Sequence, residues 1–286
     1  MILVTTAGKV GTEAVRLLAE RQLPVRVLVR DPAKTKTKAK ALVDAGAGAQ
    51  VVVGDLEAPA SIDAAMAGVT AVVLVSPAVP AQELNVVASA ARAGVRHIVK
   101  VTSKASPDSP IARRRGQSEI EAGLAASGVP HTLLRANAYM QNALAWAPEI
   151  AKTGGFGSAA GNGRTGLLDA RDVAAVAAEI AATPTAHVGK TYWLSGPQSI
   201  SNDDVAAVLS RLLARTVTYR GLSFEEHKDA MIRAGVPERI AHMNAQAFSL
   251  TAEGDAEWVT QDVPTLLGRQ ARSFEQFAAD HAASFV

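Results

Sequence analysis

The apolar residues in the first half of the chain gather in short runs, and segments with helical spacing separate these runs. The first run covers residues 2–4, and Ala14, Leu17 and Leu18 then recur on one helical face. Helical spacing bounded by Pro or Gly predicts further helices. The later apolar runs are residues 25–30, 50–53, 71–75, 97–101 and 131–134, and the later helices are residues 59–66, 80–93 and 111–126.

These apolar runs carry few polar residues, which is typical of a parallel sheet that helices cover on both faces. The regular alternation of strands with helices favours an α/β protein. An eight-stranded barrel would need more strand–helix units than this length of chain supplies. We therefore expect a Rossmann-type, doubly wound parallel sheet.

The pattern changes beyond about Asn142. A glycine-rich passage leads into an alanine-rich helix over residues 168–182, whose Asp169 and Asp172 suit its N-terminal end. Short strands and helices follow to the end of the chain. We predict an NAD(P)-binding Rossmann domain over residues 1–141 with part of 165–195, and a smaller C-terminal α/β lobe over residues 142–286 that binds the substrate. The expected later elements are strands at 191–194 and 216–219 and helices from Ser201, over 224–234 and 237–248, and around 274–277.

Composition narrows the range of functions. The 286 residues are 48% hydrophobic, enough to bury one large core or a large core with a smaller lobe. A net charge of +2 does not supply the positive field of a nucleic-acid-binding protein, so no nucleic-acid partner is expected. The absence of cysteine excludes disulfides, thiolate metal sites and cysteine nucleophiles, and the six histidines lack metal-ligand spacing. We expect no metal.

Neither a leader sequence nor a bilayer-spanning segment is evident. No charged and apolar leader precedes the first predicted strand, and no apolar run reaches the roughly 18 residues that cross a bilayer. We therefore expect a cytoplasmic protein with no membrane partner. The sequence leaves a homodimer open.

A glycine turn joins the first predicted strand to the first predicted helix. Gly8 and Gly11 allow close approach of a ligand to the backbone, and the first helical turn offers free N–H groups to an anion such as a dinucleotide pyrophosphate. Thr5 stands where the first glycine of the full dinucleotide fingerprint would fall, so an ordinary strand-to-helix turn remains an alternative. The residues expected to hold the pyrophosphate are Thr5, Thr6, Gly8, Lys9, Val10 and Gly11.

The end of the second predicted strand bears on the choice of cofactor. A basic residue there suits the 2′-phosphate of NADP, whereas an acidic one suits the 2′-hydroxyl of NAD. Arg30 occupies this place, with Lys34 close behind, although Asp31 follows directly. The preference we infer is NADP(H), with NAD(H) also possible. A solvated helix face is the alternative role for the lysines in this segment.

Other candidate cofactor residues follow the ends of later strands, where open α/β sheets bind ligands. Asp55 and Leu56 would lie beside the adenine, although Asp55 could instead cap a helix. Ser76 and Pro77 would lie near the middle of the cofactor. The remaining candidates are Thr102, Asn137 and Ala138, which follow the fifth and sixth strands.

Taken together, these segments resemble the NmrA-like family of atypical short-chain dehydrogenase/reductases, and within it the bacterial quinone reductases and triphenylmethane reductases. One departure is the turn before Gly8, which lacks the family's first glycine and is one residue shorter. The resemblance spans nearly the whole chain. The segments that carry it are residues 4–11, 29–32, 54–56, 121–135, 169–174, 189–192, 195–197 and 234–237.

The resemblance also bears on catalysis. Typical short-chain dehydrogenases use a Tyr-x-x-x-Lys pair, in which the tyrosine protonates a carbonyl. Arg113 and Gln117 occupy those places here, and loss of the pair resembles the NmrA-like group. Reductase members pass hydride directly to an electron-poor acceptor, whereas regulatory members bind the dinucleotide without turnover. We expect an NADPH-preferring oxidoreductase acting on a small quinone-like, carbonyl or dye acceptor, with a non-catalytic redox sensor as the alternative.

Four residues are candidates for the catalytic pocket. Ser103 could hydrogen-bond a substrate oxygen or merely shape a turn, and Lys104 could stabilise an oxyanion or be a solvated lysine. Gln117 should face the nicotinamide, and Tyr139 could form part of the substrate wall or pack in a core. The same two alternatives apply to the aromatic residues Trp146, Phe156 and Phe248.

Overall fold

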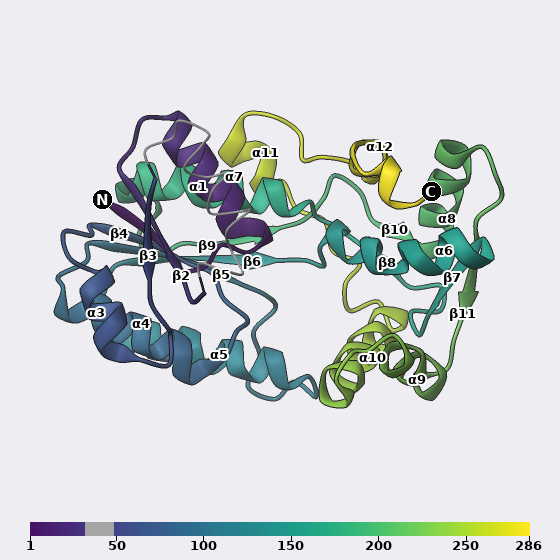
Figure 1. Ribbon diagram of the computed structural model, residues 1–286, viewed down its shortest axis with the longest axis horizontal. Coiled ribbons are helices and arrows are strands. Elements are labelled where there is room, and N and C mark those ends of the chain that lie inside the picture. Colours follow the sequence, from purple (N-terminus) through teal and green to yellow (C-terminus); the bar gives the residue numbers. More distant parts are fainter. Residues whose placement is uncertain (32–48) are drawn as a thin grey trace. The chain divides into compact units, whose positions relative to one another are not determined.

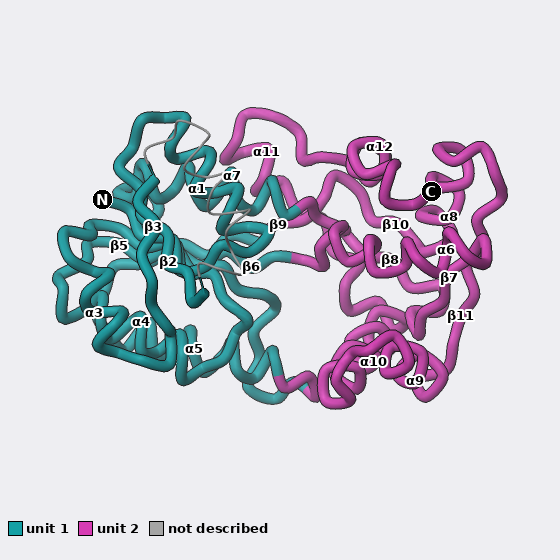
Figure 2. The backbone as a smooth tube through the Cα atoms, viewed as in Figure 1, with its two compact units in different colours: residues 1–109, 113–136, 170–193 teal, residues 110–112, 137–169, 194–286 magenta. Residues whose placement is uncertain are grey.

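The structure is a computed structural model, and it describes residues 1–31 and 49–286. The chain divides into two compact units (Figure 2). Unit 1 comprises residues 1–109, 113–136 and 170–193. Unit 2 comprises residues 110–112, 137–169 and 194–286.

Unit 1 is built on a seven-stranded sheet with the order β3-β2-β1-β4-β5-β6-β9 (Figure 1). Its strands are β1 (Ile2–Val4), β2 (Val25–Val29), β3 (Gln50–Val53), β4 (Ala71–Leu74), β5 (His97–Thr102), β6 (His131–Ala136) and β9 (Thr191–Leu194). The pairs from β3 to β6 are parallel. Leu133 N donates to Lys190 O and Asn137 N to Leu194 O, so β9 runs parallel to β6 as well. The expected Rossmann-type α/β fold is confirmed.

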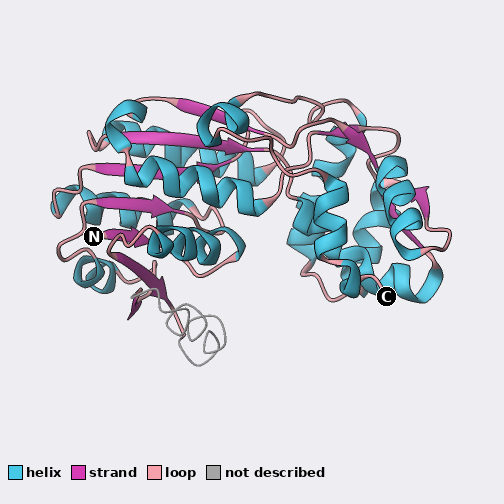
Figure 3. Cartoon of the chain, turned by 90° about the horizontal axis from the view of Figure 1, so that it is seen from above, coloured by secondary structure: helices cyan, strands magenta, loops and turns pink. Residues whose placement is uncertain are grey.

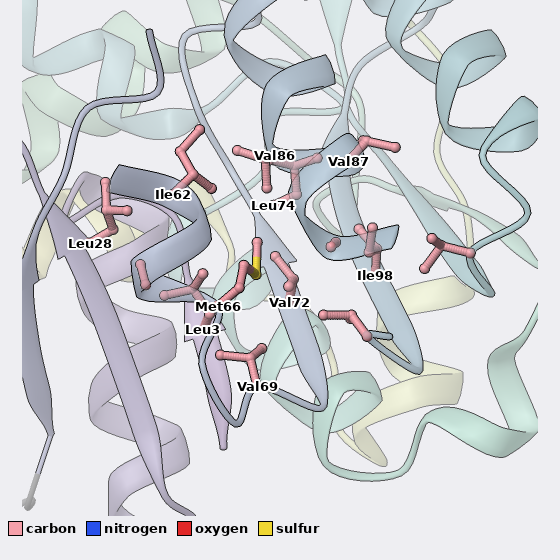
Figure 4. Close-up of a cluster of buried hydrophobic side chains, with 14 of the residues drawn as sticks. Leu3, Leu28, Ile62, Met66, Val69, Val72, Leu74, Val86, Val87 and Ile98 are labelled. Atoms are coloured by element: carbon pink, nitrogen blue, oxygen red, sulfur yellow. The ribbon is translucent and has the colours of Figure 1, made fainter. Parts of the chain in front are cut away.

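Helices cover both faces of this sheet, as the fully buried strands β1, β2, β4 and β5 require (Figures 1 and 3). On one face α1 (Lys9–Glu20) packs against α7 (Ala170–Ala182). The other face carries α3 (Pro59–Ala65), α4 (Pro80–Arg92) and α5 (Ala112–Ala126). Proline in the first turn of α3 and α4 favours initiation, because its missing N–H would be unpaired there anyway. The core beneath α3 and α4 includes Leu3, Ile62, Met66, Val72, Leu74, Val86 and Ile98 (Figure 4).

Unit 2 has its own core, which includes Phe156, Leu209, Phe274, Phe277 and Phe285. Its two small sheets pair β10 (Ile200–Ser201) with β8 (Arg164–Thr165), antiparallel, and β11 (Thr218–Gly221) with β7 (Gly155–Ser158), parallel. Its helices are α6 (Ala147–Thr153), α8 (Asn202–Leu213), α9 (Phe224–Arg233), α10 (Glu238–Ala252), α11 (Asp262–Leu267) and α12 (Phe274–Asp280). Its short 3-10 segments are Met140–Trp146 and Ala282–Ser284, and a further one in unit 1 is Pro184–His187.

Three helices of unit 2 begin at serine capping boxes. Ser201 is paired with Asp204, Ser223 with Glu226, and Ser273 with Gln276. In each box the serine hydroxyl accepts from a backbone N–H of the first turn, which would otherwise be unpaired. Such local signals explain why the starts of α8 and α9 lie where the sequence predicts them.

Some boundaries differ from the sequence expectation. The strand expected over residues 216–219 runs from Thr218 to Gly221, because β11 takes its register from β7, with Thr218 opposite Gly155. The glycine-rich passage itself contains β7, which the sequence does not mark as a strand. None of the helices in the described ranges is long and apolar enough to cross a membrane.

Candidate functional site

A pocket of about 300 Å³ lies in unit 1 beyond the carboxyl ends of β1, β2 and β3. It brings together seven of the predicted cofactor residues: Thr5, Thr6, Gly8, Arg30, Asp55, Leu56 and Pro77. Its other lining residues are Ala7, Leu28, Val29, Gly54 and Gln82. Lys9, Val10, Gly11, Ser76, Thr102, Asn137 and Ala138 do not line it, and Lys34 lies outside the described residues.

Thr5, the residue in place of the first fingerprint glycine, turns its hydroxyl toward β4. Its Oγ1 accepts from Val75 N at 2.9 Å and donates to Val75 O at 2.8 Å. The neighbouring Thr6 Oγ1 also donates to Val75 O, at 3.0 Å. Thr5 is only 1% exposed. The departure from the fingerprint is therefore accommodated by hydrogen bonds that tie the turn to the adjacent strand end.

The two glycines of the turn have different roles. A Cβ on Gly11 would lie 1.8 Å from the carbonyl oxygen of Thr6, so packing of α1 on the turn requires glycine there. A Cβ on Gly8 would meet nothing closer than Thr6 Oγ1 at 3.7 Å. Gly8 precedes α1, and its φ of −79° is open to any residue. The absence of a side chain at Gly8 thus leaves space in the pocket rather than relieving strain.

The N-terminus of α1 is suited to an anion. The N-cap residue of α1 is Gly8, which has no side chain to cap the first turn. The N–H groups of a first helical turn lack partners within the helix and carry partial positive charge. An anionic group could therefore be held at the Gly8 end of the pocket.

Arg30 follows β2 at the rim of the same pocket. Its side chain is exposed, and its guanidinium has no hydrogen-bond or ion-pair partner within the described residues. A guanidinium held at this place could bind a phosphate through two N–H groups. The pocket thus has anion-binding groups at both Gly8 and Arg30.

On the remaining wall, Asp55 also shapes its own turn. Its Oδ1 accepts from Glu57 N at 3.0 Å, and its backbone N–H donates to Ser61 Oγ at 2.9 Å. Gln82 of α4 reaches the same segment, where its Nε2 donates to Glu57 Oε1 at 2.8 Å. Gln82 lines the pocket but carries no signal in the sequence, because it is one polar residue among several on an amphipathic helix.

The carboxyl end of β5 carries three of the predicted residues. Ser103 Oγ is shielded from solvent and has no hydrogen-bond partner among the described residues. Thr102 Oγ1 lies 3.0 Å from both Gln117 Oε1 and Glu121 Oε1, so its hydroxyl is engaged inside unit 1. Gln117 is 5% exposed. Lys104, which follows Ser103, is partly buried.

The candidates after β6 belong to unit 2. Asn137 Nδ2 donates to the carbonyl oxygens of Ala256 and Trp258, at 3.0 and 3.3 Å, and its Oδ1 accepts from Ala138 N. Asn137 thus anchors residues 256–258. Ala138 is exposed, and Tyr139 forms a backbone bridge with Leu168. Contact of these residues with a nicotinamide stays a prediction.

The aromatic residues of unit 2 pack on one another. Trp146 stacks on Phe156 with ring centroids 4.4 Å apart, and Phe248 lies 6.4 Å from Trp146. His227 meets Phe248 edge-on at 4.8 Å, and its Nδ1 accepts from Ala159 N. Phe156 is buried, so packing accounts for it. A substrate wall made of these residues stays a prediction.

Comparisons with known proteins find similar reductases. The chain is 37% identical over 289 residues to the NAD(P)H azoreductase of Xenophilus azovorans, covering 100% of this chain and 99% of that one. It is 32% identical to quinone oxidoreductase 2 of Escherichia coli, covering 86% of each.

Two solved reductase structures are similar to this chain over nearly its whole length. The Escherichia coli NADPH-dependent quinone oxidoreductase QOR2 complexed with NADPH matches with a TM-score of 0.87 and 30% identity, over 99% of this chain and 100% of that one. The Citrobacter triphenylmethane reductase complexed with NADP(H) matches at 0.84 and 26%, over 98% and 100%. The model of the NmrA-like family matches residues 1–278, and the chain therefore belongs to the NmrA-like family.

Proposed function

We propose that this protein is an NADPH-preferring reductase that transfers hydride to a small, electron-poor acceptor such as a quinone or an azo dye. The observation that carries the proposal is the unit 1 pocket, in which the open Gly8 turn and the exposed Arg30 lie together. The full-length relatives named for NAD(P)H, azo and quinone reduction support it.

The residues of this pocket fit NADPH. The pyrophosphate suits the N-terminus of α1 at Gly8, and the 2′-phosphate suits the Arg30 guanidinium. Leu56 and Pro77 offer apolar surface to the adenosine half. When bound, NADPH supplies the hydride, and the protein contributes binding and orientation.

The choice of acceptor follows from the groups on β5 and α5. Helix α5 contains no tyrosine and no lysine, so it offers no acid of the Tyr-Lys type. The neutral groups at the end of β5 and on α5 are the Ser103 hydroxyl, which has no partner among the described residues, and the Gln117 amide. A quinone that accepts hydride becomes a delocalised hydroquinone anion, which takes its proton from water, so orientation and neutral hydrogen bonds suffice.

The test is a fluorescence titration with NADPH and NADH, followed by a panel of quinones and azo dyes in the same sample. We expect tight NADPH binding and acceptor-dependent oxidation. Arg30→Ala should weaken NADPH binding at least tenfold, or about 1.4 kcal/mol, and change NADH binding less than twofold. Arg96→Ala, an exposed arginine just before β5, is the matched control and should change neither.

Two results would contradict the proposal. NADPH binding without oxidation by any acceptor would favour the redox sensor, for which the missing Tyr-Lys pair is the supporting observation. Equal loss of NADPH and NADH affinity in Arg30→Ala would remove Arg30 from recognition of the 2′-phosphate.

A further inference from the structure

A charged pair is buried in unit 1, between the sheet and α4. The Nζ atom of Lys100 on β5 lies 2.6 Å from Oε2 of Glu83 in the first turn of α4, and both side chains are 0% exposed. Lys100 Nζ also donates to Val101 O at 2.7 Å. Burial lowers the pKa of Lys100, and the Glu83 charge opposes this shift. The backbone of β5 thus fixes the ammonium beside the Glu83 carboxylate, whose charge it neutralises.

The same carboxylate holds the turn between β4 and α4. Ser76 Oγ donates to Glu83 Oε1 at 2.6 Å and accepts from Ala78 N at 3.2 Å. Ala78 has a φ of 61°, in the left-handed region that non-glycine residues rarely adopt. Pro77, between these two residues, lines the unit 1 pocket. Glu83 is therefore linked through Ser76 to the wall of the pocket.

Packing alone does not explain this pair. Apolar residues of similar volume often replace a buried ion pair with no loss of stability, because desolvation of the charges offsets their attraction. An apolar residue at position 83 would leave the Ser76 hydroxyl without its acceptor, and an isolated carboxylate there would be costly. What the pair provides is a hydrogen-bond acceptor for the Ser76 hydroxyl, and Lys100 neutralises the charge of this acceptor.

We propose that Glu83, its charge neutralised by Lys100, is a positioning residue that holds Ser76, Pro77 and Ala78 in the conformation required to bind the cofactor. Thr5 and Thr6 secure the start of this turn from β1, through Val75. Glu83 secures the rest of it from α4, through Ser76. The inference rests on the proposed function in taking NADPH as the ligand.

Two double variants separate positioning from packing. Glu83→Leu with Lys100→Met removes both charges and the acceptor for Ser76, whereas Glu83→Gln with Lys100→Met removes the charges but keeps an amide oxygen. NADPH dissociation constants and melting temperatures are measured for both, for Ser76→Ala, and for Val86→Ala, a buried apolar truncation on the same helix. We expect the Leu/Met variant and Ser76→Ala to weaken NADPH binding at least fivefold. The Gln/Met variant and Val86→Ala should stay within twofold of wild type.

The proposal is overturned if the folded Glu83→Leu/Lys100→Met variant binds NADPH within twofold of wild type. It is also overturned if Val86→Ala lowers the melting temperature by as much as that double variant does and weakens NADPH binding by as much. If the Leu/Met variant does not fold, Ser76→Ala decides: affinity within twofold of wild type overturns the proposal.

Hydrogen exchange without ligand keeps this test independent of the proposed function. The Ala78 amide should exchange faster than in wild type in Ser76→Ala and in Glu83→Leu/Lys100→Met. It should exchange at the wild-type rate in Glu83→Gln/Lys100→Met. If wild type binds no NADPH but this exchange pattern is found, the proposed function fails while the pair still orders the turn. Unchanged Ala78 exchange in all variants overturns the positioning role itself.

Discussion

The hydroxyl of Thr5 forms two hydrogen bonds with the backbone of Val75, one to its N–H and one to its carbonyl oxygen, across the carboxyl ends of β1 and β4. A residue that departs from the dinucleotide fingerprint thus connects two strand ends beside the unit 1 pocket. Thr5→Gly would place a glycine three residues before Gly8 but remove both bonds. We expect a loss of about 2 kcal/mol in the free energy of unfolding, from the lost hydrogen bonds and the added backbone freedom of glycine.

Urea unfolding, paired with NADPH titration, measures the effect of Thr5→Gly. Thr5→Ser keeps the hydroxyl and is the matched control, with expected values close to wild type. A Thr5→Gly protein that is as stable as wild type and binds NADPH more tightly would show that threonine impairs the turn.

Substitution by alanine should have different effects at the two glycines of the turn. Gly11→Ala places a methyl group against the Thr6 carbonyl and should cost about 3 kcal/mol of stability, although alanine usually favours a helix. Gly8→Ala meets open space and should melt close to wild type while binding NADPH at least tenfold more weakly. Thermal unfolding and fluorescence titration of both variants check this. Tight NADPH binding by Gly8→Ala would place the pyrophosphate elsewhere.

Two buried histidines should make the fold sensitive to acid. Burial lowers the pKa of both His97 and His227 from 6.5 to about 4. Below pH 6.5 the unfolded chain binds protons that the folded chain does not, so stability present above that pH is lost as the pH falls toward 4. Each histidine should cost about 2 kcal/mol of unfolding free energy between pH 7.5 and pH 5.

Urea unfolding at pH 7.5, 6 and 5 measures this acid sensitivity. The double variant His97→Gln/His227→Gln should have a free energy of unfolding that changes less with pH, whatever its stability at pH 7.5. An equally steep loss in that double variant would assign the effect to other groups.

Asn137 should act mainly on residues 256–258. Asn137→Ala removes both bonds to the Ala256 and Trp258 carbonyls, and Asn137→Asp points a carboxylate at them. We expect a stability loss of about 1–3 kcal/mol for alanine, and more for aspartate because an acceptor replaces a donor. Limited proteolysis near Ala256 should accelerate in both variants. Unchanged proteolysis with weakened NADPH binding would instead support the nicotinamide contact.

The sequence predicts those parts of the pocket that depend on local spacing. Gly8 follows an apolar strand and Arg30 ends the next one, so both can be identified without knowledge of distant residues. The role of the Thr5 hydroxyl could not be predicted, because Val75, its partner, lies far along the chain. Glu83 and Lys100 illustrate the same limit: a lysine within an apolar run signals an unusual site, but not its partner on α4.

Some strands of the fold can likewise be predicted from the sequence, and others cannot. The strands of the main sheet from β1 to β6 are apolar runs, whereas β8 has only two residues and β7 is rich in glycine. Backbone pairing with β11 and β10 defines these short strands, and that pairing leaves no periodic mark in the sequence.

The discontinuity of unit 1 has a consequence for synthesis of the chain. Helix α1, made first, packs against α7, whose residues follow a long stretch assigned to unit 2. Unit 1 therefore cannot complete its fold on the ribosome until α7 and β9 have emerged, and such non-local contacts slow folding. A fragment ending at residue 141 would expose the buried face of α1 and should aggregate, even though it contains every residue that lines the unit 1 pocket.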